Sequence, residues 1–186
     1  MNTKDNQRVK LTKRMLQDTL LHLLREKALD QLSVSELCQR ASINRTTFYR
    51  HYGCIGDVLA EMEDALIAAV KKRVEEYPLA GEQELRKRLE TCAVCLRENE
   101  ELSRLLLVNN VDPGFAEKVL RVTRIQQELD EYFAPRYDAE SRRLVSAYML
   151  SGCFSMIRCW LLENSGKTPG QVADLLLEMF PADRKV

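Results

Sequence analysis

The most chemically distinctive stretch of the chain is NRTTFYRHY, residues 44–52, which combines positive charge, hydroxyl groups and aromatic rings. It contains Arg45, Arg50 and His51 but no aspartate or glutamate. Arginine can donate paired hydrogen bonds to a guanine edge, and threonine and tyrosine hydroxyls can donate to phosphate oxygens. An acidic side chain at the same place would repel phosphate. These residue types therefore indicate a surface that binds a polyanion.

The charge distribution along the chain supports this interpretation. The 186 residues carry no formal net charge, yet residues 1–54 hold ten basic side chains against five acidic ones, a net charge of +5. The remainder therefore carries −5. Asymmetry of this kind is expected when one end of a protein meets a nucleic acid.

Three short helices are expected to position the stretch. Leucines at 16, 20, 23 and 24 follow the spacing of one buried helix face, with Thr12 as a candidate N-cap. A second helix is expected to open at Ser33, which forms a capping-box pattern with Glu36. Residues 42–44 then predict a turn, and Asn44 caps a third helix that ends near 52–53. Three helices with a tight turn before the last form a helix-turn-helix unit, whose last helix enters the DNA major groove.

The rest of the chain is also expected to be helical. The sequence has few turn residues, with 7 Gly and 5 Pro, and no segment alternates in the manner of a strand. We predict an all-α fold, with a DNA-binding domain over residues 1–54 and a bundle for effector binding and dimerisation over 55–186. The expected bundle helices cover residues 57–76, 82–99, 101–109, a segment after 114 that runs through 133, 140–164 and 169–180.

The segment LSVSELCQRASINRTTFYRHYG, residues 32–53, resembles the DNA-binding segment of the TetR/AcrR family of bacterial transcription regulators. The resemblance covers roughly residues 8–60. It includes the specific core formed by Thr47, Phe48, Tyr49, His51 and Tyr52. It implies a cytoplasmic homodimer that grips a palindromic DNA operator, acts as a repressor, and releases DNA when an effector enters the C-terminal domain.

The resemblance also implies roles for single residues. Arg45 and Thr46 would read base edges, beside Arg50 on the same outward side. Phosphate-contacting positions of the family correspond to Thr47, Tyr49 and His51. Other expected DNA contacts are Ser33 and Ser35 on the second helix, and Lys10 and Lys13 through salt-sensitive attraction.

One position departs from the family pattern. Family members often have a lysine at the start of the fourth helix that touches the DNA backbone. Here the stretch is Gly53-Cys54-Ile55-Gly56, which carries no charge. The phosphate contact is therefore either lost or made by backbone N–H groups at that helix N-terminus.

The segment from Tyr148 to Phe180 resembles the C-terminal region of a mostly Gram-positive subgroup of these regulators. In the family, the last two helices pack against their twofold mates. Small residues would allow the paired helices to approach closely, and large residues would anchor the interface. The final helix would add a matching apolar stripe. The alternative is that these residues form the core within one chain. The expected interface residues are Ser151, Gly152, Phe154, Ser155, Trp160, Val172, Leu175, Leu176 and Met179.

An effector pocket would lie among the helices between residues 57 and 135. Candidate walls are Met62, Leu66, Cys92, Leu96, Leu105, Phe115 and Tyr132, and each can equally serve as plain core. No charged cluster indicates a ligand class. The alternative is a TetR-shaped activator or interaction protein controlled by a protein partner. A sizeable apolar cavity would favour the ligand-driven protein, and a solid core with an exposed apolar patch the partner-driven one.

Other functional classes find little support in the sequence. No phosphate-binding glycine loop occurs, so we expect no enzyme and no cofactor. Cys92 and Cys95 lack a second ligand pair, so no metal site is predicted, although a redox pair there or at Cys153 and Cys159 stays open. The longest uncharged run, residues 144–157, is shorter than the ~20 residues of a membrane span. We expect the six cysteines to stay reduced in a cytosolic protein.

Overall fold

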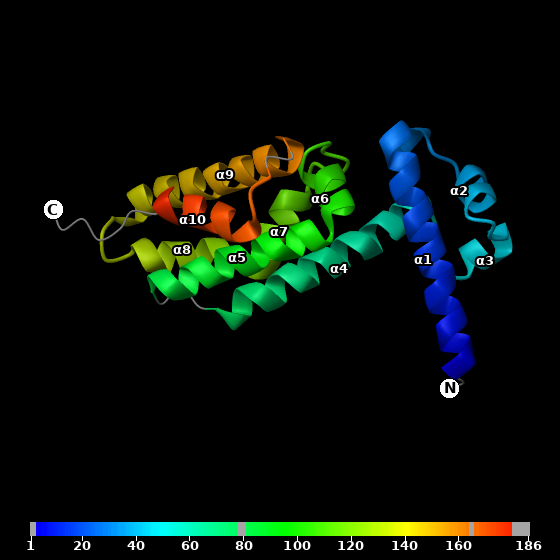
Figure 1. Ribbon diagram of the computed structural model, residues 1–186, viewed down its shortest axis with the longest axis horizontal. Helices are drawn as coiled ribbons and strands as arrows, with labels where there is room; N and C mark the ends of the chain where they lie inside the picture. The colour runs from blue at the N-terminus through cyan, green and yellow to red at the C-terminus, as the bar shows by residue number, and fades with distance from the viewer. Residues whose placement is uncertain (1–2, 78–80, 164–165, 180–186) are drawn as a thin grey trace. The chain divides into compact units, whose positions relative to one another are not determined.

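The computed structural model describes residues 3–77, 81–163 and 166–179. Every regular element in these ranges is helical, which confirms the all-α prediction (Figure 1). The chain divides into two compact units, Met1–Ala65 and Leu66–Val186, here called unit 1 and unit 2. The helix α4 (Ile55–Glu76) contributes residues to both.

Unit 1 contains α1 (Thr3–Glu26), a single 3-10 turn η1 (Leu29–Gln31), α2 (Val34–Arg40), α3 (Arg45–Tyr49) and the first half of α4. Its core is built from side chains that are fully shielded from solvent. Each buried side chain of this size contributes about 1.5–3 kcal/mol relative to exposure. These core residues are Leu16, Leu20, Leu23, Leu37, Phe48 and Val58.

The first helix begins nine residues earlier than predicted. α1 starts at Thr3, so Thr12 lies inside the helix and cannot cap it. The segment before Thr12 contains neither proline nor glycine, and nothing in it ends a helix. Lys10 and Lys13 therefore both lie within the helix.

Unit 2 is a bundle formed by the second half of α4 and six further helices. α10 packs along α5, and α9 contacts α6, α8 and α10 (Figure 1). The six helices are α5 (Glu82–Glu98), α6 (Glu100–Leu107), α7 (Phe115–Thr123), α8 (Ile125–Phe133), α9 (Ala139–Glu163) and α10 (Pro169–Met179).

The single helix predicted from residue 115 through Phe133 is wrong, because it breaks in the middle. Arg124 has a φ of 54°, in the left-handed region, and separates α7 from α8. The preceding Thr123 donates its hydroxyl to the carbonyl oxygen of Val119 at 2.7 Å. This bond competes for the carbonyl that a continuing helix uses, and such bonding bends helices.

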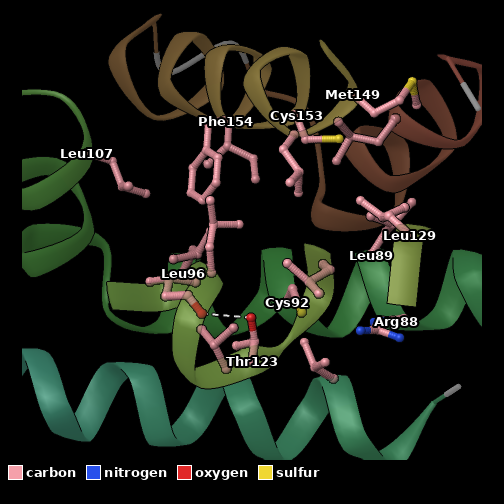
Figure 2. A pocket seen from close by; sticks show the side chains of 18 of the residues that line it. Arg88, Leu89, Cys92, Leu96, Leu107, Thr123, Leu129, Met149, Cys153 and Phe154 are labelled. Carbon is pink, nitrogen blue, oxygen red and sulfur yellow. Dashed lines mark hydrogen bonds between the residues drawn. The ribbon is translucent and has the colours of Figure 1, made fainter. Parts of the chain in front are cut away.

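The helices of unit 2 enclose a cavity of about 130 Å³ (Figure 2). Residues from all seven helical segments of the unit line it, and the lining is almost entirely apolar. Leu96, Phe115, Leu129 and Phe154 are typical of its walls.

α9 buries one side and exposes the other. Its length and composition alone would allow it to cross a membrane. The buried side includes Met149, Leu150 and Leu161, which pack inside unit 2. The exposed side carries a row of residues, mostly three or four positions apart with Ser151 and Gly152 adjacent, here called the α9 stripe: Leu144, Tyr148, Ser151, Gly152, Ser155, Cys159 and Leu162.

Candidate nucleic-acid interface

The turn between α2 and α3 orients the third helix. Ser42 adopts a left-handed conformation, with φ 56°, and the Ile43 N–H donates to the carbonyl of Cys38 at 2.9 Å. Asn44 then caps α3, because its side-chain oxygen accepts the Thr46 N–H at 2.8 Å. The predicted turn and cap are both present. The left-handed conformation at a non-glycine residue costs roughly 1–2 kcal/mol.

The inner side of α3 is held by aromatic packing. Phe48 is fully buried and Tyr52 nearly so. The Phe48 ring lies 5.7 Å from that of Tyr52 and 5.4 Å, edge-on, from that of Tyr49. Burial, together with the nearby Glu61 carboxylate, raises the pKa of Tyr52 well above its usual range. The Tyr52 ring is therefore a neutral part of the core at all physiological pH values.

The outer side of α3 is open. Arg45, Thr46 and Arg50 are exposed, and Tyr49 keeps 59% of its surface accessible. The other two positions with expected phosphate contacts, Thr47 and His51, are half-buried. The helix thus presents two guanidinium groups and two hydroxyl groups without an acidic side chain among them. Such a surface can donate hydrogen bonds to phosphates and base edges.

The serines of α2 take part in contacts within unit 1. The Ser33 hydroxyl accepts the Glu36 N–H at 3.1 Å and so caps α2, which leaves its own O–H free to donate. Ser35 accepts a hydrogen bond from the Arg45 guanidinium. This contact brings α2 and α3 together at the surface where both residues were expected to meet DNA.

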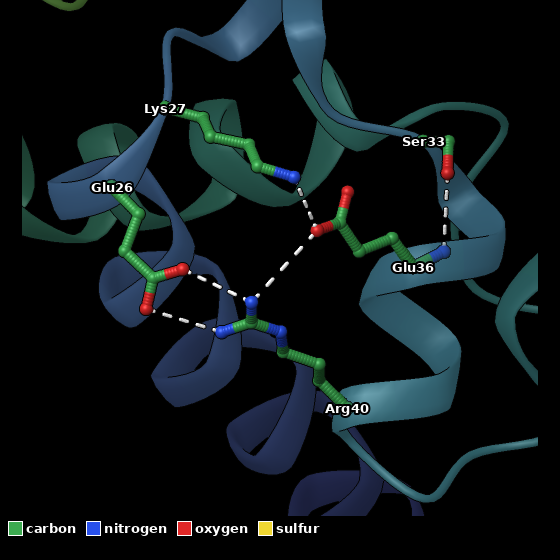
Figure 3. Close-up of polar contacts among 5 residues, drawn as sticks. All are labelled: Glu26, Lys27, Ser33, Glu36 and Arg40. Carbon is green, nitrogen blue, oxygen red and sulfur yellow. Dashed lines mark hydrogen bonds and ion pairs between the residues drawn. The ribbon is translucent and has the colours of Figure 1, made fainter.

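Four charged side chains join α1 to α2 (Figure 3). Lys27 lies 2.7 Å from the Glu36 carboxylate, and Arg40 lies 3.0 Å from that of Glu26 and 4.0 Å from that of Glu36. The Arg40 guanidinium holds the pKa of Glu26 below its usual range. The Glu36 side chain therefore binds Lys27 and Arg40, so only the Ser33 half of the predicted capping box is seen among these contacts.

The two N-terminal lysines differ in their surroundings. Lys10 is exposed on α1. Lys13 instead pairs with Glu61 at 2.7 Å and lies 5.3 Å from the centre of the Tyr52 ring. Lys13 is part-exposed in this pair, and its expected contact with DNA stays a prediction.

At the N-terminus of α4, the backbone N–H groups of Gly53 and Cys54 are already hydrogen-bonded. Both N–H groups donate to the Asp57 carboxylate, at 2.7 and 3.1 Å. These bonds, with that of Gly53 the stronger, hold the pKa of Asp57 below its usual range. An ionised carboxylate at this place repels phosphate. The N–H groups of Gly53 and Cys54 are thus already paired within the protein, while the choice between a lost contact and one made by the other N–H groups of this helix end stays a prediction.

Three of the seven expected pocket residues line the cavity of unit 2: Cys92, Leu96 and Phe115. Met62 and Leu66 are buried on α4 outside its lining, and Leu105 is buried in α6. Tyr132 packs against the core cluster that contains Leu129 and Phe133. These four residues are therefore not among those that line the cavity.

The expected interface residues separate into exposed and buried groups. Ser151, Gly152, Ser155 and Met179 are exposed, and Leu175 is half-buried. Trp160, Val172 and Leu176 are buried within the chain, and Phe154 lines the cavity. These four therefore belong to the intramolecular core, the alternative considered from the sequence.

Contacts within the chain explain the burial of Trp160. Its indole N–H donates to the carbonyl oxygen of Lys167 at 2.9 Å, and the Arg97 guanidinium stacks 4.2 Å from its ring centre. Sequence reasoning missed the exposed apolar members of the α9 stripe, namely Leu144, Tyr148 and Leu162. The sequence pattern did not single them out, because α9 is apolar on both sides.

The six cysteines form no disulfide in the structure. Burial raises the pKa of Cys92 and of Cys153 to about 11, so both are neutral thiols at pH 7. In the part of the chain that the structure describes, no group of three His, Cys, Asp or Glu side chains could hold a metal ion.

No protein-family model matches the sequence, and no curated protein is a significant match. Solved structures do match. The chain is similar to the TetR family transcriptional regulator PfmR from Thermus thermophilus, at 19% identity over 91% of this chain and 100% of that one, with a TM-score of 0.63. It is also similar to the fatty acid degradation regulator FadR from Bacillus halodurans, at 16% identity over 91% of this chain and 96% of that one, with a TM-score of 0.64.

A third similar structure is Thermus thermophilus FadR, a TetR family transcriptional repressor in complex with lauroyl-CoA. Here the identity is 16%, over 94% of this chain and 98% of that one, with a TM-score of 0.56. The matched regions include both units. The chain therefore has the fold of TetR-family transcriptional regulators.

Proposed function

We propose that the protein is a cytoplasmic transcription regulator of the TetR family that binds a palindromic DNA operator as a homodimer. Residues 1–54 form the DNA-binding domain in this proposal, and residues 55–186 the effector-binding and dimerisation domain. The observation that carries it is the exposed, acid-free side of α3 in a helix-turn-helix unit of TetR-like fold. In such units this helix enters the major groove with its N-terminal residues nearest the bases.

The assignments on α3 follow from position and exposure. Arg45 is the first helical residue, and with Thr46 it reads base edges. Tyr49 and Arg50 donate to phosphates, as do Thr47 and His51 at the margin of the exposed side. Because Ser35 already holds the Arg45 guanidinium, that side chain is ordered before DNA arrives and loses less entropy on binding. Lys10 and Ser33 complete the proposed DNA contacts.

Dimerisation is proposed to occur through the α9 stripe. The stripe combines exposed Leu144, Tyr148 and Leu162 with the small residues Ser151, Gly152 and Ser155. Exposed apolar rows of this kind mark interaction surfaces, and small residues allow two helices to approach closely. A twofold pair of α9 helices also matches the twofold symmetry of a palindromic operator.

An effector is proposed to act through the cavity of unit 2. Apart from Arg88 the lining of this cavity is almost entirely apolar, which supports a ligand-driven regulator over a partner-driven one. Ligand entry would change the separation of the two α3 helices from the ~34–36 Å of one DNA turn and release the operator. The protein is thus proposed to be a repressor.

The test is selection of DNA from genomic fragments by the purified full-length protein, run beside Arg45→Ala. Enrichment of a palindrome by the wild type and not by the variant supports the proposal. A folded wild-type dimer that enriches no sequence would contradict it. Circular dichroism and sedimentation of both proteins confirm that the comparison is between folded dimers.

A further inference from the structure

The cavity of unit 2 has one charged residue among the side chains that line it. Arg88 lies on α5 and is only 2% exposed, although arginine is seldom buried without full pairing. Figure 2 shows it beside Leu89 and Leu129, on the opposite side of the lining from Leu107. The cavity therefore has a cationic end and an apolar end.

The contacts of Arg88 leave one edge of its guanidinium unused. Nη1 lies 2.6 Å from the Glu128 carboxylate and donates to the Tyr77 carbonyl oxygen at 3.4 Å. Nε and Nη2 are buried, and no atom of the described residues accepts a hydrogen bond from either. Buried donors of a charged group are rarely left without an acceptor, because their desolvation is then uncompensated.

The unused edge has a defined shape. Nε–H and one N–H of Nη2 point in parallel, and this pair matches the two oxygens of a carboxylate in a bidentate contact. A neutral alcohol can accept from only one of them, and an ammonium group is repelled. The walls beyond Arg88 are apolar and include Leu96, Phe115 and Phe154, so the remainder of a ligand there must be hydrocarbon.

We propose that the cavity binds a small carboxylic acid with an apolar body, its carboxylate on the Nε–Nη2 edge of Arg88. An apolar cavity of roughly 150 Å³ accommodates benzene, so about five or six carbon atoms fit the ~130 Å³ here. The inference rests on the proposed function only in naming this ligand as the effector. Binding itself requires no DNA.

Glu128 competes with such a ligand. Its carboxylate lies on the other side of the same guanidinium and links α8 to α5. A second anion on Arg88 weakens this pair, and the Glu128 side chain, 37% exposed, can turn to solvent. Ligand binding is thereby coupled to the contact between α5 and α8.

The experiment is calorimetric titration of the full-length protein, without DNA, with three six-carbon probes: hexanoate, 1-hexanol and hexylammonium. A bidentate charge-assisted contact predicts that hexanoate binds about 10- to 100-fold more tightly than hexanol, and that hexylammonium does not bind measurably. Equal affinity for hexanoate and hexanol, or no binding of hexanoate, overturns the proposal.

Two variants locate the contact. Arg88→Met keeps the apolar stem and should abolish the preference for hexanoate over hexanol, and a retained preference overturns the assignment. Since a buried Arg88 variant can fail to fold, Glu128→Gln at the half-exposed partner is the second test. Without the competing anion, Glu128→Gln should bind hexanoate at least several-fold more tightly and hexanol unchanged. An unaltered hexanoate-to-hexanol ratio in folded Glu128→Gln overturns the proposal, and neither result depends on whether the protein selects DNA.

Discussion

Gly152 offers a substitution that should affect the dimer and spare the single chain. It lies in the middle of the α9 stripe, and a Cβ built on it meets no atom within 4 Å. Gly152→Phe therefore has room in the isolated protomer. Phenylalanine also favours helix over glycine, which should raise the stability of the protomer by about 0.5 kcal/mol.

The cost in the dimer follows from the exposure of the stripe. Leu144 is 69% exposed, Tyr148 75% and Leu162 56%. At about 25 cal/mol per Å² of apolar surface, burying these three side chains contributes roughly 5 kcal/mol per protomer. A phenylalanine that separates the two α9 helices and forfeits half of this loses about 2.5 kcal/mol per protomer, or about 5 kcal/mol per dimer, which corresponds to a dimer Kd larger by roughly 1,000- to 10,000-fold.

Sedimentation equilibrium over a range of protein concentrations measures that constant, and thermal unfolding checks the fold of the variant. Ala68→Phe is the matched control, because it adds the same ring at an exposed position of α4. We expect the control to dimerise like the wild type. A folded Gly152→Phe protein with the wild-type dimer constant would refute the assignment of the α9 stripe as the interface.

Three further predictions concern unit 1. Arg50→Ala should reduce the slope of log K against log salt for DNA binding by about 0.9, as for one lost phosphate contact, and an unchanged slope in anisotropy titrations argues against that contact. Asp57 has a folded-state pKa below the ordinary 3.8, so its stabilising effect is complete above about pH 4 and is lost as the pH falls through the folded value. Asp57→Asn should therefore lose less stability than the wild type between pH 5 and 2 in urea unfolding, and parallel curves would contradict this. Ser42→Gly should raise the free energy of unfolding by about 0.5–1 kcal/mol because it relieves the left-handed conformation, whereas a decrease would show that Ser42 is not strained.

Local chemistry made part of this structure predictable. Capping depends on a few neighbouring residues, so Ser33 and Asn44 could be identified as caps from the sequence, and the turn at 42–44 with them. The exposure of Arg45, Thr46 and Tyr49 followed from the burial of Phe48 on the same short helix. These features need only the periodicity of a helix and its end groups.

Features that depend on distant residues could not be predicted. Lys13 meets a partner 48 residues away, and the burial of Arg88 in the Glu82–Glu98 helix depends on residues of other helices. α9 is apolar on both sides, so its pattern does not reveal which side faces a second protomer. For this reason Trp160 was expected at the interface although it packs inside the chain.

The most direct test of DNA reading by α3 is an anisotropy titration of the selected palindrome and a scrambled duplex with wild type and Arg45→Ala. The wild type should prefer the palindrome. Arg45→Ala should lose about 1–3 kcal/mol of that preference per half-site while keeping its affinity for the scrambled duplex within a few-fold. A folded, dimeric Arg45→Ala protein with undiminished preference for the palindrome would contradict the proposed reading of DNA by this helix.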